Sequence, residues 1–314
     1  MLLVGLADIA VSARERACVV APTVSGVLLG AHNVQSRRQL QQLVQALREL
    51  RDDDAFLICM DRSALTRSPV CDGFTRLPAP ARLGEVWDVE PARAVELAEE
   101  HAWLMASELR AVDVDLVMPS PILGQDSDHG RQRDRMLHAD PLAIAELGQG
   151  LVRGVRLAGM SAVPGYFPVN GRADDASLQP FADAVTGGAE AMMMASAGAS
   201  EWARSRIDDV LRDELGFEGL VVANDACLID ADAGADVAAY LHACHDAGCD
   251  LIPVCRPDLL DAALAAAGDL SPCDSAHATR LRGAVGATWT ALEDNPQRDQ
   301  FIARVQALDG EPAS

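Results

Sequence analysis

Residues 211–228 decide the fold, and they read Leu-Arg-Asp-Glu-Leu-Gly-Phe-Glu-Gly-Leu-Val-Val-Ala-Asn-Asp-Ala-Cys-Leu. The first part is typical of the end of an amphipathic helix, and Gly216 is placed to cap it because glycine adopts the left-handed conformation at little cost. Residues 220–222 form a continuous apolar run, which predicts a strand buried on both faces. The run ends at Asn224 and Asp225. A polar pair at the end of a buried parallel strand is where a barrel enzyme holds its catalytic groups.

The rest of the chain repeats this alternation of helix and strand. Apolar runs that predict strands lie at residues 2–6, 24–29, 56–60, 114–118, 161–163, 191–195, 220–222 and 251–254. About eight β-α units in 314 residues fit a closed (β/α)8 barrel of the TIM type, in the α/β class. A doubly wound open sheet is the alternative, but no Gly-x-Gly-x-x-Gly turn follows the first strand.

The intervals between these elements complete the expected organisation. Residues 61–90, which are rich in Pro, Arg and Asp, and residues 164–177 read as loops. The run Met192–Met194 reads as barrel core. We expect one domain over residues 1–314, with a helical, polar tail from about residue 275.

Composition bounds the function. The chain has a formal net charge of −21 and contains no lysine, so it is a poor candidate for nucleic-acid binding, and a Schiff-base lysine is excluded. Its eight cysteines lack the spacing of a disulfide scaffold, which predicts free thiols in a reducing cytoplasm. We expect no signal peptide and no membrane span, because no basic segment precedes an apolar core and no apolar run is long enough.

Six further segments carry a recognisable pattern. They are Gly73–Pro78, Trp103–Leu109, Leu137–Pro141, Phe167–Pro168 with Gly171, Leu211–Leu220 and Asp246–Cys255. In this order they resemble the β-N-acetylglucosaminidases of glycoside hydrolase family 3 that act in bacterial peptidoglycan recycling. The resemblance covers roughly residues 2–270 and implies the same barrel. It also implies a retaining hydrolase with an aspartate nucleophile and a histidine–aspartate acid/base pair.

The residue that the resemblance makes the nucleophile is replaced. Where the family has Ser-Asp, this chain has Ala223-Asn224, so that Asn224 occupies the nucleophile position. An amide resembles a carboxylate in shape, but without the charge it cannot readily form a glycosyl ester or stabilise an oxocarbenium ion. Asp225 is a possible substitute. Successive side chains of an extended chain point to opposite sides, however, so Asp225 would need a change of register.

The acid/base segment is altered as well. The family's Lys-His-Phe-Pro-Gly-His-Gly corresponds to residues 165–171, which read Gly-Tyr-Phe-Pro-Val-Asn-Gly. The family's Asp-Ser-His reads Asp175-Ala176-Ser177, and Ser177 stands at the position of the acid/base histidine. Serine does not titrate near neutral pH. Asp174 or Asp175 would be a substitute donor if it were buried, but a solvated acidic loop is the simpler interpretation.

Four positions are candidates for ligand binding: Asp61, Arg135, Tyr166 and Asn170. By the resemblance, Asp61 is what remains of a motif that binds sugar hydroxyls, and Tyr166 and Asn170 replace two histidines. Arg135 begins an Arg-x-x-His-Ala-Asp-Pro match in which Asp140-Pro141 should open a helix and His138 should be structural. We expect no cofactor. We also expect no metal, because His242, Cys244, His245, Cys249 and Cys255 are not spaced to converge on an ion.

The replacements favour a catalytically impaired relative. It would bind an amino-sugar, a muropeptide-like ligand or another small molecule. Alternatively, it would act as an interaction or regulatory protein, with a protein partner or as a homo-oligomer. We expect it to bind neither nucleic acid nor a membrane. Three alternatives stay open. A working β-N-acetylhexosaminidase would use Asp225 with Asp174 or Asp175. A different enzyme on the same barrel would use Tyr166, Asp61 and Arg135 in new roles. A scaffold without a ligand would have its mouth plugged by bulky side chains such as Leu65, Tyr166 or Val169.

Overall fold

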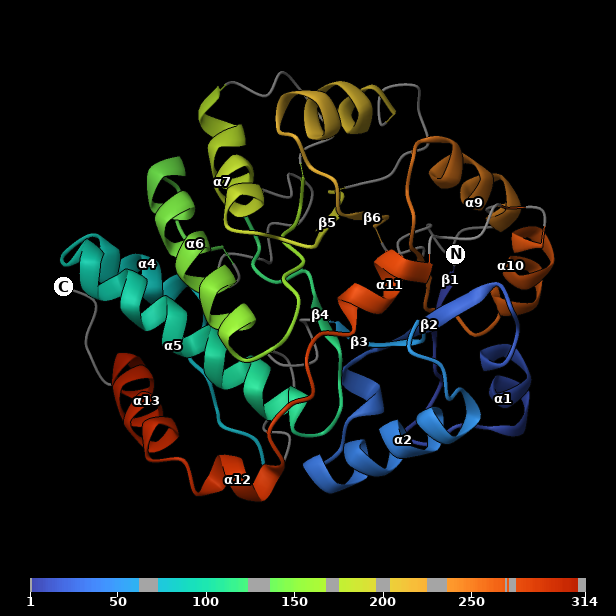
Figure 1. Ribbon diagram of the computed structural model, residues 1–314, viewed down its shortest axis with the longest axis horizontal. Helices are drawn as coiled ribbons and strands as arrows, with labels where there is room; N and C mark the ends of the chain where they lie inside the picture. Colours follow the sequence, from blue (N-terminus) through green and yellow to red (C-terminus); the bar gives the residue numbers. More distant parts are fainter. Residues whose placement is uncertain are drawn as a thin grey trace.

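The structure is a computed structural model, and it describes residues 2–61, 73–123, 136–167, 175–195, 204–224, 236–268, 270 and 275–309. Strands in these ranges occupy the centre and helices surround them (Figure 1). The strands are β1 (Leu2–Gly5), β2 (Val24–Leu29), β3 (Leu57–Asp61), β4 (Leu116–Met118), β5 (Ala191–Met193), β6 (Leu220–Val222) and β7 (Ile252–Val254).

The strands close into a ring. Five of them form a parallel sheet in the order β4-β3-β2-β1-β7, and β5 pairs in parallel with β6. Isolated parallel bridges complete the ring: Val222–Leu251, Phe167–Met194 and Ile122–Gly165. They link β6 to β7, and they link residues 163–167 both to β5 and to the chain just after β4. Residues 163–167 therefore supply the eighth strand position, and the (β/α)8 barrel expected from the sequence is confirmed.

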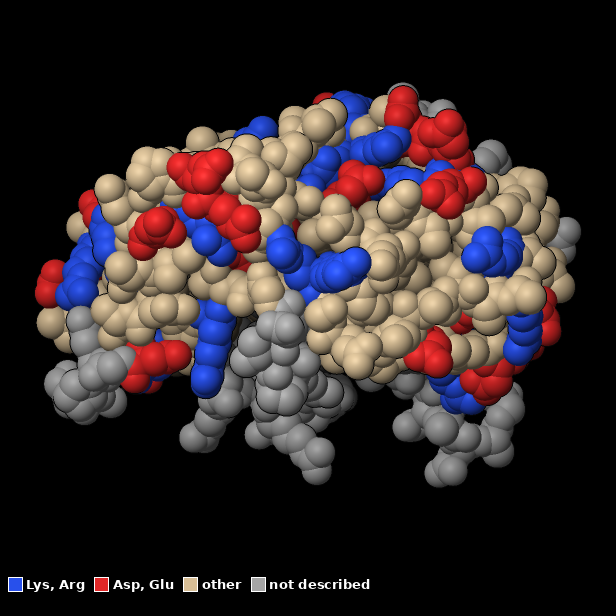
Figure 2. Space-filling view, turned by 90° about the horizontal axis from the view of Figure 1, so that it is seen from below, with Lys and Arg blue, Asp and Glu red and all other residues tan. Residues whose placement is uncertain are grey.

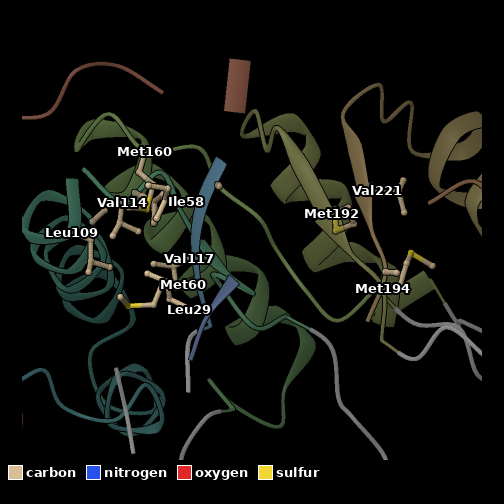
Figure 3. Packing of buried hydrophobic residues seen from close by; sticks show 14 of the residues in the cluster. Leu29, Ile58, Met60, Leu109, Val114, Val117, Met160, Met192, Met194 and Val221 are labelled. Atoms are coloured by element: carbon tan, nitrogen blue, oxygen red, sulfur yellow. The ribbon is translucent and has the colours of Figure 1, made fainter. Parts of the chain in front are cut away.

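Side chains alternate between the barrel interior and an outer layer, as the two-residue period of a strand requires. The interior is one apolar cluster made of Leu3, Leu28, Leu57, Cys59, Leu116, Met118, Val163, Ala191, Met193, Leu220, Val222, Leu251 and Leu281. The outward-facing neighbours belong to a second cluster that includes the helices. Figure 3 shows part of this outer layer, with Met192 and Val221 on one side of the barrel and Val117 on the other.

The helices begin and end at residues whose chemistry explains the boundary. The larger helices are α1 (Ala13–Val19), α2 (Arg37–Leu50), α4 (Ala81–Trp87), α5 (Pro91–Arg110), α6 (Pro141–Leu157), α7 (Asp175–Thr186), the π-helix η3 (Arg206–Glu214), α9 (Val237–Asp246) and α10 (Leu260–Ala267). The Asp140 side chain accepts a hydrogen bond from the backbone N–H of Leu142, so Asp140-Pro141 opens α6 as predicted. Gly216, with φ of 65°, follows η3 in the predicted left-handed conformation.

Two of the expected loops contain helix. The expectation that residues 61–90 are irregular is wrong for α4, a short helix whose Leu83 and Gly84 are buried. The many prolines around α4 concealed its seven residues. The expectation of a loop over residues 164–177 is wrong at its end, because α7 begins at Asp175. α7 contains Pro180, a residue type that is common in the first turn of a helix, and the helix extends more than one turn before it.

The amino-terminal end of the barrel is closed by a buried charge cluster and by α11 (Ser275–Leu281). Asp115 is fully buried, and its carboxylate lies 2.6 Å from Arg48 and 3.0 Å from Arg110. Leu281, at the end of α11, joins the interior cluster. In Figure 1, α11 crosses in front of the ring of strands.

The remainder of the tail packs on α5. It forms α12 (Trp289–Glu293), α13 (Pro296–Gln306) and the short η5 (Ala307–Asp309). Phe301 meets Trp103 edge to face with ring centroids 5.4 Å apart, and Arg298 lies 2.7 Å from the buried Glu108 carboxylate. The tail is therefore helical, as expected, but it also contributes buried apolar side chains such as Val305.

The surface combines both signs of charge. Basic and acidic side chains are interspersed over the face in Figure 2. Exposed pairs such as Arg14–Asp261 and Arg153–Glu99 contribute little to stability, because water screens them. None of the helices in the described ranges is long and apolar enough to cross a membrane.

Candidate active site

Asn224 lies just beyond β6, on the inner side of the barrel. Leu220 and Val222 point into the interior cluster, while Ala223 belongs to the outer one, so alternation directs Asn224 inward. Its side chain is buried, with 7% of the residue exposed, and its Nδ2 donates a hydrogen bond to the backbone carbonyl of Ala195 beyond β5. The amide therefore bridges the ends of two neighbouring strands.

This hydrogen bond needs a donor. An asparagine amide has two N–H donors, whereas an ionised carboxylate is only an acceptor. An aspartate in the same rotamer would place a carboxylate oxygen against the Ala195 carbonyl oxygen. The local geometry therefore suits the residue that is present and opposes the aspartate that the family resemblance would place there.

Gly165 lies where the resemblance places the family's lysine, and the surroundings leave no room for a side chain. A Cβ on Gly165 would be 2.8 Å from Cβ of Pro119 and 3.1 Å from Cβ of Met193. The first distance is shorter than ordinary carbon contacts, so a larger residue would require the barrel mouth to open. The lysine that the resemblance would place here therefore does not fit the packing around Gly165.

Two candidate ligand-binding residues lie at the same end of the barrel. Asp61 is the last residue of β3, is partly exposed, and shares the inward alternation of Leu57 and Cys59. Tyr166 is half-buried and contacts both the interior and the outer cluster. An acidic side chain and an aromatic ring therefore remain at the carboxyl ends of the strands.

The other predicted residues divide into two groups. Ser177 is exposed in the first turn of α7, and Asp175 is the first residue of that helix. The remaining candidates lie outside the described residues: Asp225, Asp174, Arg135 and Asn170. Leu65 and Val169, named as possible plugs of the mouth, also lie outside them.

His138 has the contacts of a structural residue. Its Nδ1 accepts a hydrogen bond from the backbone N–H of Asp140 at 2.9 Å, and its Nε2 lies 3.2 Å from the Asp88 carboxylate. Its ring also packs against Trp87, with centroids 5.5 Å apart. His138 therefore connects α4 to the start of α6.

The histidine and cysteine positions of α9 are occupied by local contacts. A His242 ring nitrogen lies 2.7 Å from the Ala238 carbonyl. Burial raises the pKa of Cys244 to about 11, although a hydrogen bond between Cys244 and Tyr240 opposes the rise, and burial likewise raises the pKa of Cys249. Over the described ranges, no three His, Cys, Asp or Glu side chains are grouped as a metal ion would need.

Tyr240 is a site residue that the sequence did not reveal. Its hydroxyl, on α9, donates a 2.7 Å hydrogen bond to the backbone carbonyl of Asn224. The chain has only two tyrosines, and both contribute to the carboxyl-terminal end of the barrel. The small number of tyrosines was the one feature of the sequence that could have drawn attention to Tyr240. Its contact with Asn224, however, depends on how α9 packs against the barrel.

A closed ring of parallel β-α units with its polar residues at the carboxyl ends places the chain among the TIM-type barrels. Residues 2–177 match the glycosyl hydrolase family 3 N-terminal domain. The chain is 34% identical over 324 residues to a beta-hexosaminidase of Stenotrophomonas maltophilia, with 93% of this chain and 94% of the relative covered. A beta-hexosaminidase of Thioalkalivibrio sulfidiphilus is 33% identical over 344 residues, with 99% and 97% covered. The chain therefore belongs to glycoside hydrolase family 3.

Solved structures agree with this fold. Native NagZ from Neisseria gonorrhoeae superposes with a TM-score of 0.84 at 24% identity, covering 99% of this chain and 98% of that one. A family 3 β-N-acetylglucosaminidase from Paenibacillus gives a TM-score of 0.78 at 22% identity, with 98% of this chain and 67% of that one covered. The barrel of this family is thus conserved in the chain.

Proposed function

We propose that this chain is a non-hydrolytic member of glycoside hydrolase family 3. The observation that carries the proposal is Asn224, which stands at the nucleophile position of the family resemblance. Its amide is buried and donates to the Ala195 carbonyl. A retaining hydrolase needs a carboxylate nucleophile at that point, since the intermediate is a glycosyl ester.

Two further positions support the loss of hydrolysis. The lysine position is Gly165, where Pro119 and Met193 leave no space for a side chain. The acid/base histidine position is Ser177, which is exposed on α7 and cannot act as an acid near neutral pH. Because three separate segments are altered, one compensating residue would not restore the mechanism.

We propose that the mouth of the barrel still binds an amino sugar. Asp61 and Tyr166 supply an acidic acceptor and an aromatic surface at the carboxyl ends of the strands. Ligand sites commonly combine apolar and aromatic walls with a few fixed polar groups. A cytoplasmic location fits the five cysteines that are free in the described ranges, four of them buried.

Hydrolysis is tested with a chromogenic N-acetylglucosaminide. We expect no turnover above the rate without protein, because nucleophile and acid/base are both absent. Turnover that disappears in Asp225→Asn would show that a displaced carboxylate does the chemistry, and would refute the proposal.

Binding is tested separately by isothermal titration with N-acetylglucosamine. We expect saturable binding that weakens about tenfold in Tyr166→Ala, since that change removes an aromatic wall. Val89→Ala, an exposed residue beyond α4, is the matched control and should bind like the unmodified chain. The absence of binding would reject the sugar site and leave the loss of hydrolysis untouched.

A further inference from the structure

A pocket lies at the amino-terminal ends of the strands, away from Asn224. It has a volume of about 560 Å³ and is formed by the end of α6, the chain before residue 163, the turn before β5 and the end of α11. Figure 1 shows α6 and α11, the two helices whose ends contribute to it. Small-molecule sites have volumes of this order.

The charged side chains that line this pocket are mostly basic. Arg153 and Arg156 come from α6 and Arg280 from α11, and Glu190 is the acidic residue among the lining side chains. Arg156 is paired with Glu190 at 3.1 Å, and Arg153 with Glu99 at 3.0 Å. The Arg280 side chain is exposed and has no ion pair or hydrogen bond with any residue in the described ranges. One positive charge is therefore left uncompensated, in a chain of net charge −21.

The other charged groups are held in place before any ligand arrives. Arg156 Nη1 donates to the Gly187 carbonyl at 2.7 Å, in addition to its pairing with Glu190. The second oxygen of Glu190 accepts from the backbone N–H of Ala162 at 2.9 Å. Glu190 is thus fixed by two elements, so that it stays with Arg156 instead of neutralising Arg280. Preorganised guanidinium groups bind carboxylates and phosphates through two parallel hydrogen bonds.

The pocket also has an apolar wall. Leu157 lines it and is 66% exposed, and the buried Met160 lies beside it. An exposed leucine next to arginines suits a ligand that carries an apolar body as well as an anionic group.

We propose that this amino-terminal pocket binds a small organic oxyanion, a phosphate ester or a carboxylate, with an apolar body. Arg280 provides the charge for the oxyanion, Arg153 and Arg156 frame it, and Leu157 contacts the apolar part. The site is independent of the sugar-binding mouth, because it lies at the opposite end of the barrel.

The test is isothermal titration of the full chain with phenyl phosphate, benzoate and inorganic phosphate in a chloride buffer. We expect saturable binding of phenyl phosphate or benzoate, with the tighter of the two identifying the anionic group. Inorganic phosphate should bind more weakly because it lacks the apolar body. Arg280→Gln should weaken binding about tenfold, as expected for the loss of one charge-assisted hydrogen bond.

Arg38→Gln is the matched control. Arg38 is also exposed on a helix, α2, and has no ion pair within the described ranges, so its loss removes the same charge elsewhere. It should leave binding unchanged. The proposal is overturned if none of the three probes binds saturably, or if the two variants weaken binding equally, since that would show a general effect of net charge.

Discussion

At the scale of single residues, we propose that Asn224 is where this chain departs from the chemistry of its family. We predict that Asn224→Asp lowers the free energy of unfolding by about 1–3 kcal/mol near neutral pH, since two buried acceptors would face each other. It should also fail to restore hydrolysis, because the lysine and histidine positions stay altered. Urea denaturation and the chromogenic assay measure the two effects.

The same variant contains its own control. A protonated carboxyl group can donate a hydrogen bond to the Ala195 carbonyl, as the amide does. The loss of stability should therefore shrink as the pH is lowered. An Asn224→Asp chain that is as stable as the original at neutral pH, and that hydrolyses the substrate, would contradict the reading of this site.

The residues at the site were only partly predictable from the sequence. The strand before Asn224 and the cap at Gly216 followed from local patterns, and both are in place. The closed space at Gly165 was not visible, because it depends on Pro119 and Met193 from two other strand positions. The local sequence shows a glycine at position 165, where the resemblance would place a lysine. The packing that leaves no room for a lysine there depends on the assembled barrel.

At the scale of the elements, Asp115 connects α2, β3 and α5. Its carboxylate contacts Arg48 at 2.6 Å and Arg110 at 3.0 Å and accepts from the Ile58 backbone N–H at 2.8 Å. We predict that Asp115→Asn lowers the free energy of unfolding by about 3–5 kcal/mol, since it leaves buried guanidinium charge uncompensated. Urea denaturation would measure the loss.

Asp113→Asn is the matched control for that cluster. Asp113 pairs with the same Arg48 at 2.8 Å, but its side chain is 50% exposed. Its left-handed backbone, with φ of 64°, also suits asparagine. The change should cost less than about 1 kcal/mol. Equal losses in the two variants would contradict the assignment of the stabilisation to the buried pair.

The contact between α13 and α5 should depend on pH. Burial raises the pKa of Glu100, and the Arg304 guanidinium, 2.7 Å away, opposes that shift. Because the folded pKa exceeds the unfolded value of 4.5, the stabilisation by Glu100 is complete below that value and is lost as the pH rises through the folded pKa. We predict that Glu100→Gln does not lose this stabilisation as the pH rises. The free energy of unfolding of the variant, relative to that of the original chain, should therefore increase with pH.

Denaturation at several pH values between about 4 and 8 would measure that trend. Glu96→Gln is the control, since Glu96 pairs with the same Arg304 but its side chain is 68% exposed. It should leave the pH dependence of stability as in the original chain. A pH trend that survives in Glu100→Gln would show that another group is responsible.

Element boundaries were predictable where one signal dominated. α6 begins at Pro141 after its Asp140 cap, and β2 follows its apolar run. The short α4 and the start of α7 were missed, because prolines near both suggested loops or a later start. The strand position at residues 163–167 forms only isolated bridges, so its local sequence carried little signal beyond residue 163.

At the scale of the whole molecule, the barrel separates framework from function. Its barrel is that of the family, while the positions that the family resemblance assigns to hydrolysis lie at one end and, as we propose, no longer support it. The proposed oxyanion pocket lies at the other end. Changes at either end can therefore accumulate without disturbing the ring of strands that supports both.

The tail raises the question of whether residues 1–314 form one domain, as we propose. Arg298 and Arg304 of α13 neutralise Glu108 and Glu100, which are buried on α5. Trp289 meets Phe74 with ring centroids 5.7 Å apart. Undocking the tail would remove the Arg298 partner of Glu108 and the aromatic contacts of Trp289 and Phe301, so the tail should unfold together with the barrel.

We predict that thermal unfolding gives one midpoint by circular dichroism and by tryptophan fluorescence. Circular dichroism reports mainly the helices around the barrel. Fluorescence also reports the junction between tail and barrel, because Trp103 of α5 contacts Phe301 of the tail and Trp289 of the tail contacts Phe74. Arg298→Gln should lower both midpoints together by several degrees, as a loss of about 2–3 kcal/mol implies for a chain of this size. The tail would be a separate unit if the fluorescence transition came before the circular dichroism transition, or if only the fluorescence transition shifted in Arg298→Gln. In either case the junction would open while the barrel stays folded.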